Sequence, residues 1–370
     1  MSTLFADGSP EAFGRFFLPG PTEVRPEILQ AQVRPMMGHR GAGVVALMEG
    51  LQAGLKDVFR TERPVFVSSS SATGLMEAAV RNGASGRILA LVNGAFSERF
   101  AKIALACGLA VDRLDAPWGS AHDPDVVSEA LGRGAYDAVT VVHSETSTGV
   151  LNPVERIARV VAREDDVLLL VDSVTGVGGA EVRTDAWGLD FVLTGSQKAL
   201  ALPPGLAFGV ASERMMERAE TVKARGVYFD LLAFEKNLDK MQTPNTPALS
   251  LLYALQVQLG RIRSETMERR WARHLAMAER VWTWVGAAAE RLPGLRVLAP
   301  EGFRSPTVTT VVLPEGRSSR SVVEGMKARG WVIGGGYGKL EETTFRIGHM
   351  GDHTVDEVDA LLADLEKVLT

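Results

Sequence analysis

The feature of this 370-residue chain that most constrains its fold is an alternation of short, unbroken apolar runs with segments of helical period. Such runs are typical of strands buried on both faces of a largely parallel sheet. Between them, apolar residues recur every three or four positions, as from Val44 to Val58, which predicts amphipathic helices. The alternation therefore predicts an α/β architecture. The predicted strands are 65–67, 88–92, 138–142, 167–171, 191–193 and 206–210.

The pattern changes near Ser264, where a long charged amphipathic helix is predicted. Strands then mix with two helices, and the second helix begins with a capping box made by Thr354 and Glu357. This region predicts a smaller α+β domain. Its predicted strands are 295–298, 308–313 and 345–347.

We expect three parts along the chain. Residues 1–20 are predicted to form an N-terminal arm that packs on the small domain or on a partner subunit. A large domain is predicted over 21–262 and a small C-terminal domain over 263–370.

Composition limits the possible partners and the cellular compartment. Forty Lys and Arg against 45 Asp and Glu give a net charge of −5 without a basic stripe, so we expect no nucleic-acid partner. The N-terminal residues lack the pattern of a secretory signal, and no apolar run approaches the length of a membrane span. Cys107 is the single cysteine, which excludes an intrachain disulfide and fits a reducing compartment. We expect a cytoplasmic protein with Cys107 packed in the core.

Ligands of open α/β sheets gather beyond the carboxyl ends of the strands, so the polar residues that directly follow the apolar runs are the candidate site residues. Asp172 ends the run VLLLVD, and Lys198 follows the run FVL in a small polar loop. Partial burial would lower the pKa of this lysine toward the neutral amine that acts as a nucleophile. Taken singly, a turn carboxylate and a surface lysine explain these two residues as well.

Two further junctions carry polar or aromatic residues. Val65 to Val67 lead into four serines and then Ala72 and Thr73 at a predicted helix start, where free backbone N–H groups can hold a phosphate. Ordinary helix capping is the alternative. Phe96 follows the next strand and is placed to stack on a flat cofactor, or to pack in the core.

The order along the chain is phosphate cradle, aromatic residue, carboxylate and lysine, which is what pyridoxal 5′-phosphate (PLP) chemistry requires. The sequence resembles the class V aminotransferases of PLP fold type I, similar to alanine–glyoxylate, serine–pyruvate and serine–glyoxylate aminotransferases. The resemblance implies the PLP-dependent transferase fold, with helices on both faces of a largely parallel sheet. The motifs that carry it span nearly the whole chain: FFLPGPTEV, GHRG, SSSATG, HSETSTGVLNP, VDSVTGVGG, GSQKAL, TPNTPA, SPTVTTV and FRIGHMG.

The resemblance assigns roles to the residues of these motifs. Lys198 matches the lysine that carries PLP as a Schiff base, and Asp172 matches the carboxylate that pairs with the pyridine nitrogen. Relatives often have tryptophan where this chain has Phe96, which keeps the stacking role. The predicted phosphate ligands are Ser71, Ala72, Thr73 and Gln197.

The remaining assignments concern the ring oxygen, the partner subunit and the substrate. Thr146 matches a residue near the cofactor ring oxygen, and Thr246 matches one that reaches the phosphate of the neighbouring subunit, which implies a homodimer with shared active sites. Arg346 matches the arginine that binds the substrate carboxylate. Gly20 and Arg40 lie in segments that approach the substrate.

The resemblance implies ping-pong transamination between a small amino acid and a 2-oxo acid such as glyoxylate or pyruvate. We expect alanine or serine as donor, because the sequence shows one carboxylate-binding arginine and no obvious second cation. The six histidines lack metal-ligand spacing, and no metal site is expected, although His143 lies close to the Thr146 loop.

Other functions compete with this prediction. Phosphoserine or aminophosphonate transaminases and cysteine desulfurases or lyases share the fold and the lysine, but a desulfurase needs a nucleophilic cysteine late in the chain. A nucleotide-binding α/β module without PLP is the alternative from another class. No GxGxxG motif follows the first predicted strand, which disfavours it.

Overall fold

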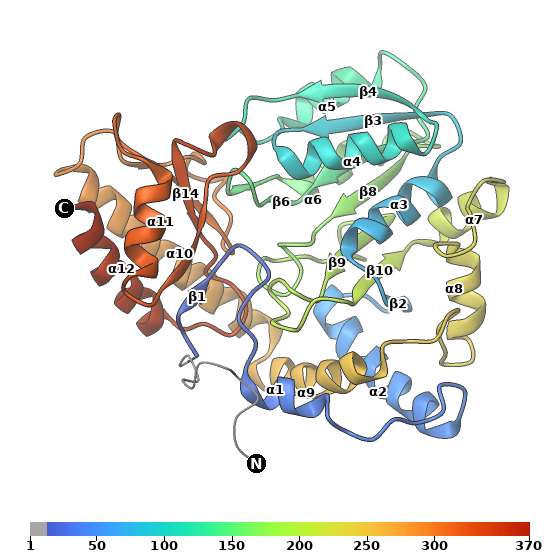
Figure 1. Ribbon diagram of the computed structural model, residues 1–370. Helices are drawn as coiled ribbons and strands as arrows, with labels where there is room; N and C mark the ends of the chain where they lie inside the picture. The colour runs from blue at the N-terminus through green and yellow to red at the C-terminus, as the bar shows by residue number, and fades with distance from the viewer. Residues whose placement is uncertain (1–12) are drawn as a thin grey trace.

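The predicted apolar runs form the interior of a seven-stranded sheet in a computed structural model that describes residues 13–370 (Figure 1). The strand order is β2-β10-β9-β8-β5-β3-β4, and the pairings from β9 through β4 are parallel, while β10 runs antiparallel to β9 and β2. The predicted, largely parallel α/β sheet is confirmed. The strands are β2 (Val65–Ser68), β3 (Arg87–Val92), β4 (Ala110–Asp115), β5 (Ala138–Val142), β8 (Leu168–Asp172), β9 (Phe191–Gly195) and β10 (Ala207–Ala211).

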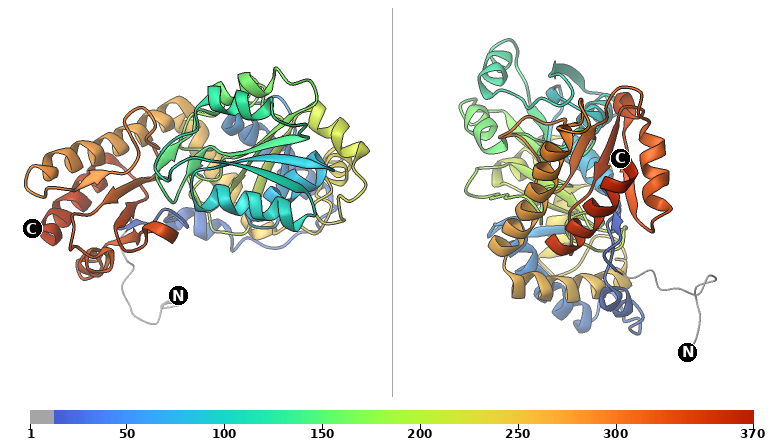
Figure 2. Two further views of the ribbon diagram at one scale, coloured as in Figure 1. Left: turned by 90° about the horizontal axis from the view of Figure 1, so that it is seen from above. Right: turned by 90° about the vertical axis from the view of Figure 1, so that its left-hand side faces the viewer.

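Helices cover both faces of this sheet (Figure 2), which explains why every residue of the central strands β5, β8, β9 and β10 is buried. A two-stranded ribbon, β6 (Ser144–Glu145) with β7 (Val150–Leu151), follows β5. The helices of this part are α1 (Pro26–Ala31), α2 (Ala42–Phe59), α3 (Ala72–Gly83), α4 (Ala95–Ala106), α5 (Pro124–Leu131), α6 (Val154–Val161), α7 (Glu213–Thr221), α8 (Leu231–Leu238) and α9 (Leu249–Glu265).

A second sheet, of order β1-β13-β14-β12-β11, packs against three helices around a separate apolar cluster. Its first strand comes from the N-terminal segment, because Phe16 and Phe17 pair in parallel with β13 (Figure 1). The elements are β1 (Phe16–Phe17), β11 (Arg296–Val297), β12 (Thr309–Val312), β13 (Val332–Gly335), β14 (Thr344–Ile347), α10 (Met267–Ala289), α11 (Ser319–Lys327), α12 (Val355–Leu369) and a 3-10 turn η1 (Gly338–Leu340).

Local signals place the ends of the two best-marked helices in this region. Thr354 and Glu357 form the predicted capping box, each side chain bonding the other residue's backbone N–H. The long charged helix expected near Ser264 begins as α10 at Met267, because Thr266 adopts φ 70° and separates it from α9. Residues 1–12 of the predicted arm lie outside the described residues, and the three domain bounds remain a prediction. Among residues 13–370, every helix is too short or too polar to cross a bilayer.

Among the strands of four or more residues, two were absent from the sequence prediction, β4 and β13; the two-residue strands β1, β6 and β7 were absent as well. The segment of β4 mixes polar and apolar residues without an apolar run, and it lies at one edge of the large sheet, where it is at most partly buried. The segment of β13 is four residues long and half glycine. Both owe their conformation to pairing with neighbouring strands, a tertiary effect that short apolar periodicity does not reveal.

A buried arginine connects α10 to the large sheet. Arg270 is 1% exposed, and its guanidinium donates hydrogen bonds to the carbonyl oxygens of Gly178 (3.0 Å) and Ala199 (2.7 Å). The same group pairs with Asp352 at 3.0 Å and Glu265 at 2.9 Å. Each nitrogen of this buried cation therefore donates to an acceptor, as a buried charge requires.

Arg270→Met should lower the free energy of unfolding by about 3–5 kcal/mol, because two carbonyl groups lose their donor and the buried Asp352 carboxylate loses its one fully buried cation. Urea unfolding of the purified variant measures the loss. Arg280→Met is the matched control on the same helix: its partner Asp359 and Arg280 itself are exposed, so stability should stay close to wild type. Equal losses in the two variants would contradict the structural role of Arg270.

Candidate active site

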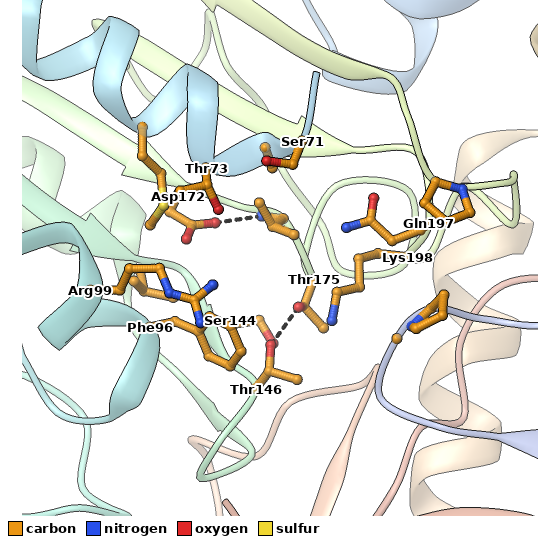
Figure 3. A pocket seen from close by; sticks show the side chains of 17 residues that line it. Ser71, Thr73, Phe96, Arg99, Ser144, Thr146, Asp172, Thr175, Gln197 and Lys198 are labelled. Carbon is orange, nitrogen blue, oxygen red and sulfur yellow. Dashed lines mark hydrogen bonds between the residues drawn. The ribbon is translucent and has the colours of Figure 1, made fainter. Parts of the chain in front are cut away.

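A cavity of about 330 Å³ lies beyond the carboxyl ends of the parallel strands, and side chains from several loops converge on it (Figure 3). Parallel strands end at the same edge of the sheet, so residues far apart in the sequence meet there. Nine of the predicted site residues line this cavity: Gly20, Ser71, Ala72, Thr73, Phe96, Thr146, Asp172, Gln197 and Lys198.

Lys198 lies in the loop between β9 and β10 and is 8% exposed. Its Nζ donates a hydrogen bond to the carbonyl oxygen of Pro19. Burial lowers the pKa of Lys198 to about 8, and the nearby Arg346 cation acts in the same direction. A substantial fraction of this amine is thus neutral near physiological pH, as imine formation requires.

The lysine loop is held by the N-terminal segment. The backbone N–H of Thr22 donates to the carbonyl oxygen of Gln197 at 2.9 Å, and its hydroxyl donates to that of Lys198 at 3.0 Å. Gly20 has φ 116°, and a Cβ atom there would collide with the Lys198 side chain. Glycine at this position therefore leaves the room that the lysine needs.

Asp172 is the last residue of β8, which delivers its carboxylate to the opposite part of the cavity. The side chain is 3% exposed and accepts a hydrogen bond from the N–H of Val174 at 2.8 Å (Figure 3). Burial raises the pKa of Asp172 to about 7. A cationic ring nitrogen beside it would stabilise the charged form, because an opposite charge lowers a carboxyl pKa.

The start of α3 forms an anion cradle. Ser71 precedes the helix in an extended conformation and makes no side-chain cap bond, so the N–H groups of Ala72 and Thr73 remain available to a ligand. The side chain of Gln197 faces the same space (Figure 3). It packs so closely over Gly195 that a Cβ there would lie 2.7 Å from its amide oxygen.

Phe96 is positioned by a buried carboxylate that sequence reasoning missed. Glu145 accepts hydrogen bonds from the N–H groups of Phe96 (3.2 Å) and Ser97 (2.9 Å) at the start of α4, and from the hydroxyl of Ser147 (2.6 Å). A carboxylate at a helix N-terminus satisfies free N–H groups and complements the helix dipole. Its signal in the sequence is an acid inside the HSETSTG motif, directly after an apolar run.

Thr146 lines the cavity, and Arg346 contacts it from outside the lining. The Thr146 hydroxyl lies 2.5 Å from that of Thr175 (Figure 3), and its carbonyl oxygen accepts a hydrogen bond from Arg346 at 3.3 Å. A second bond from Arg346 reaches the carbonyl oxygen of Gly335 at 2.9 Å. Burial lowers the pKa of Arg346, whose guanidinium keeps further N–H donors for an anion.

Three predicted residues do not line this cavity: Arg346, which contacts Thr146 beside it, and Arg40 and Thr246, which lie farther along the chain's surface loops. Arg40 donates hydrogen bonds to the carbonyl oxygens of Thr243 (2.8 Å) and Pro244 (3.1 Å), so it holds the loop that carries Thr246. Thr246 itself is exposed. The predicted substrate contact of Arg40 and the predicted reach of Thr246 into a partner's site remain predictions.

Three other expectations can be compared with the geometry. His143 is buried behind the cavity, 3.0 Å from the Ser173 hydroxyl, and burial lowers its pKa to about 4. Cys107 follows α4, is partly buried against the core and does not line the cavity. Within residues 13–370, no group of three or more His, Cys, Asp or Glu side chains is arranged to hold a metal.

The residues present fit PLP. An anion cradle, an aromatic ring, a carboxylate and a lysine surround one cavity, and they match the phosphate, ring face, ring nitrogen and aldehyde of the cofactor.

Comparison with known proteins leads to the same cofactor. The family model described as Aminotransferase class-V matches residues 27–337. The chain belongs to the class-V aminotransferase family. It is a PLP-dependent aminotransferase, and its substrates are an amino acid and a 2-oxo acid.

Named relatives extend along almost the whole chain. An uncharacterized aminotransferase of Methanocaldococcus jannaschii is 41% identical over 95% of this chain and 91% of its own length. The L-aspartate–glyoxylate aminotransferase of Paracoccus denitrificans is 33% identical over 95% of this chain and 90% of its own. The crystal structure of alanine–glyoxylate aminotransferase from Nostoc sp. superimposes with a TM-score of 0.91 at 31% identity, covering 100% of this chain and 98% of that one.

The lowered pKa of Lys198 makes PLP uptake depend on pH. With a pKa of about 8, roughly one tenth of the amine is neutral at pH 7 and roughly nine tenths at pH 9, so the rate of uptake should rise about tenfold and then level off. Visible absorbance after mixing cofactor-free protein with PLP measures this rate. A rise of about tenfold per pH unit that continues beyond pH 9 would indicate an amine with an ordinary pKa and contradict the effect of burial.

Proposed function

We propose that this enzyme transfers the amino group of a short amino acid, with alanine and serine as expected donors, to glyoxylate or pyruvate in a ping-pong cycle. The observation that carries the proposal is the buried Lys198, which shares one cavity with Asp172 and the anion cradle of α3. The names of relatives support glyoxylate as the acceptor, since both the Paracoccus and the Nostoc enzymes are glyoxylate aminotransferases.

Each side chain has a place in holding the cofactor. Ser71, Ala72, Thr73 and Gln197 would bind the phosphate, and Phe96 would stack on the ring. Asp172 would lie at the ring nitrogen, and Thr146 near the ring oxygen. When bound, PLP supplies an electrophilic aldehyde carbon and a ring that accepts electrons from the substrate.

The reaction then depends on two basic side chains. Lys198 is the general base that removes the Cα proton of the bound amino acid, since a freed amine with a pKa of about 8 can both accept and return a proton near neutral pH. Arg346 binds the substrate carboxylate in a bidentate fork, which holds the Cα–H bond in the orientation for its removal. His143 stays neutral at this pH, because burial lowers its pKa to about 4.

We further propose a cytoplasmic homodimer with three parts in each subunit: an arm over 1–20, a large domain over 21–262 and a small domain over 263–370. Exposed Thr246 would contact the phosphate in the partner's site. Arg40 would hold the loop that carries Thr246 in place near the substrate. Leu29, Val33 and Met36 are exposed apolar side chains within eight residues of the chain, in α1 and just after it, and this segment is our candidate for a surface that the partner covers.

Lys198→Ala should abolish transamination while leaving the fold intact, because it removes the general base and the attachment point of the cofactor. Release of pyruvate from alanine with glyoxylate as acceptor measures turnover. Lys102→Ala is the control, since Lys102 is an exposed lysine outside the cavity and its loss should leave turnover unchanged. Near wild-type transamination by the Lys198 variant would refute the proposal.

A further inference from the structure

A second cation faces the cavity, and the functions assigned so far leave it unused. Arg99 projects from α4 one turn after Phe96 and lines the same space as Lys198 and Asp172 (Figure 3). Its guanidinium carbon lies 4.8 Å from the centre of the Phe96 ring. The expectation that the site has no second cation is therefore wrong.

Arg99 also lacks an acidic partner. Among the described residues, no carboxylate lies within 4 Å of its guanidinium. Glu98, the residue before Arg99, pairs with Lys102 and Arg113 instead. The Arg99 guanidinium donates a hydrogen bond to the hydroxyl of Tyr337 at 3.4 Å, which is a long contact with a neutral group. A partly buried guanidinium beside a cavity keeps donors available for an anion that enters it.

The other charged groups of the site already have functions. Asp172 is matched to the ring nitrogen, the start of α3 to the phosphate, and Arg346 to the α-carboxylate of the substrate. With PLP and an alanine molecule bound in these roles, no anionic group would be assigned to direct contact with Arg99. A substrate with a second carboxylate would supply one.

The Tyr337 side chain contacts both Arg99 and Arg346. Its ring stacks on Phe96, with centroids 5.5 Å apart and planes 26° apart, and the Arg346 guanidinium carbon lies 5.3 Å from the centre of the same ring. The Tyr337 hydroxyl meets Arg99. Both guanidinium groups thus contact one tyrosine side chain, which places two cations in the same part of the site.

We propose that Arg99, positioned by the Tyr337 hydroxyl, binds the distal carboxylate of a short dicarboxylic amino donor. The enzyme then accepts an aspartate-sized donor in addition to neutral short ones. This inference rests on the proposed transaminase function and extends it to a substrate class.

The test compares two donors in one enzyme. The ratio of kcat/KM for aspartate to that for alanine, with glyoxylate as acceptor, should fall about tenfold to a hundredfold in Arg99→Gln, the range expected for losing a hydrogen bond to a charged group. Lys102→Gln removes an exposed cation from the same helix and should leave the ratio unchanged. Tyr337→Phe keeps the stacking and should lower the ratio by less, about twofold to tenfold.

A binding measurement separates recognition from chemistry. Maleate, a dicarboxylate that has no amino group to transfer, should bind the PLP-loaded wild type more tightly than acetate does, and Arg99→Gln should lose most of that preference. Calorimetry on each loaded variant gives both affinities. Visible absorbance before each experiment verifies that the variant holds PLP.

Several outcomes would overturn this inference. A wild type that converts alanine or serine but not aspartate would refute the subsite and leave the proposed function standing. An equal fall for both donors in Arg99→Gln, or an unchanged preference for maleate, would show that Arg99 does not recognise a distal carboxylate. A wild type that converts no amino donor would remove the proposed function, and this inference with it.

Discussion

The geometry of the site depends most on the hydrogen bonds and ion pairs of the buried Arg270 guanidinium. It binds the carbonyl oxygen of Ala199, the residue after Lys198, and pairs with Asp352 in the loop before the last helix. Gln258 supports the same segment by donating to the carbonyl oxygen of Leu200 at 2.9 Å. Together with the N-terminal segment, which covers Lys198 from the other side, these contacts hold a loop that has no regular secondary structure of its own.

Burial then sets the chemistry of the cavity. It lowers the pKa of Lys198 and raises that of Asp172, so an amine and a carboxyl that would be fully charged in water both titrate near neutral pH. Their environments are arranged for a ligand that brings its own charges: an anionic group for the cradle of α3 and a ring nitrogen for Asp172. Arg99 in the cavity and Arg346 beside it add positive charge, which suits a substrate that carries carboxylate groups.

Much of this arrangement could be predicted from the sequence, because buried parallel strands leave strong apolar runs and the reactive residues directly follow them. That rule singled out Asp172 and Lys198 as candidates, and the resemblance to a family assigned their roles and added Gln197 and Thr146. Contacts made by residues distant in sequence could not be found this way. Glu145, Arg99 and Tyr337 belong to local patterns that look like ordinary surface or loop residues. Only the tertiary fold brings Arg99 into the cavity and places Glu145 and Tyr337 against Phe96, which lines it.

The most direct test of the central claim is to identify the residue that carries PLP. Borohydride reduction of the PLP-loaded protein, followed by proteolysis and peptide mass spectrometry, locates the attached pyridoxyl group. We predict a single modified peptide, with the added mass on Lys198 in the sequence GSQKAL. Modification of another lysine, or a protein that binds no PLP and yields no modified peptide, would contradict it.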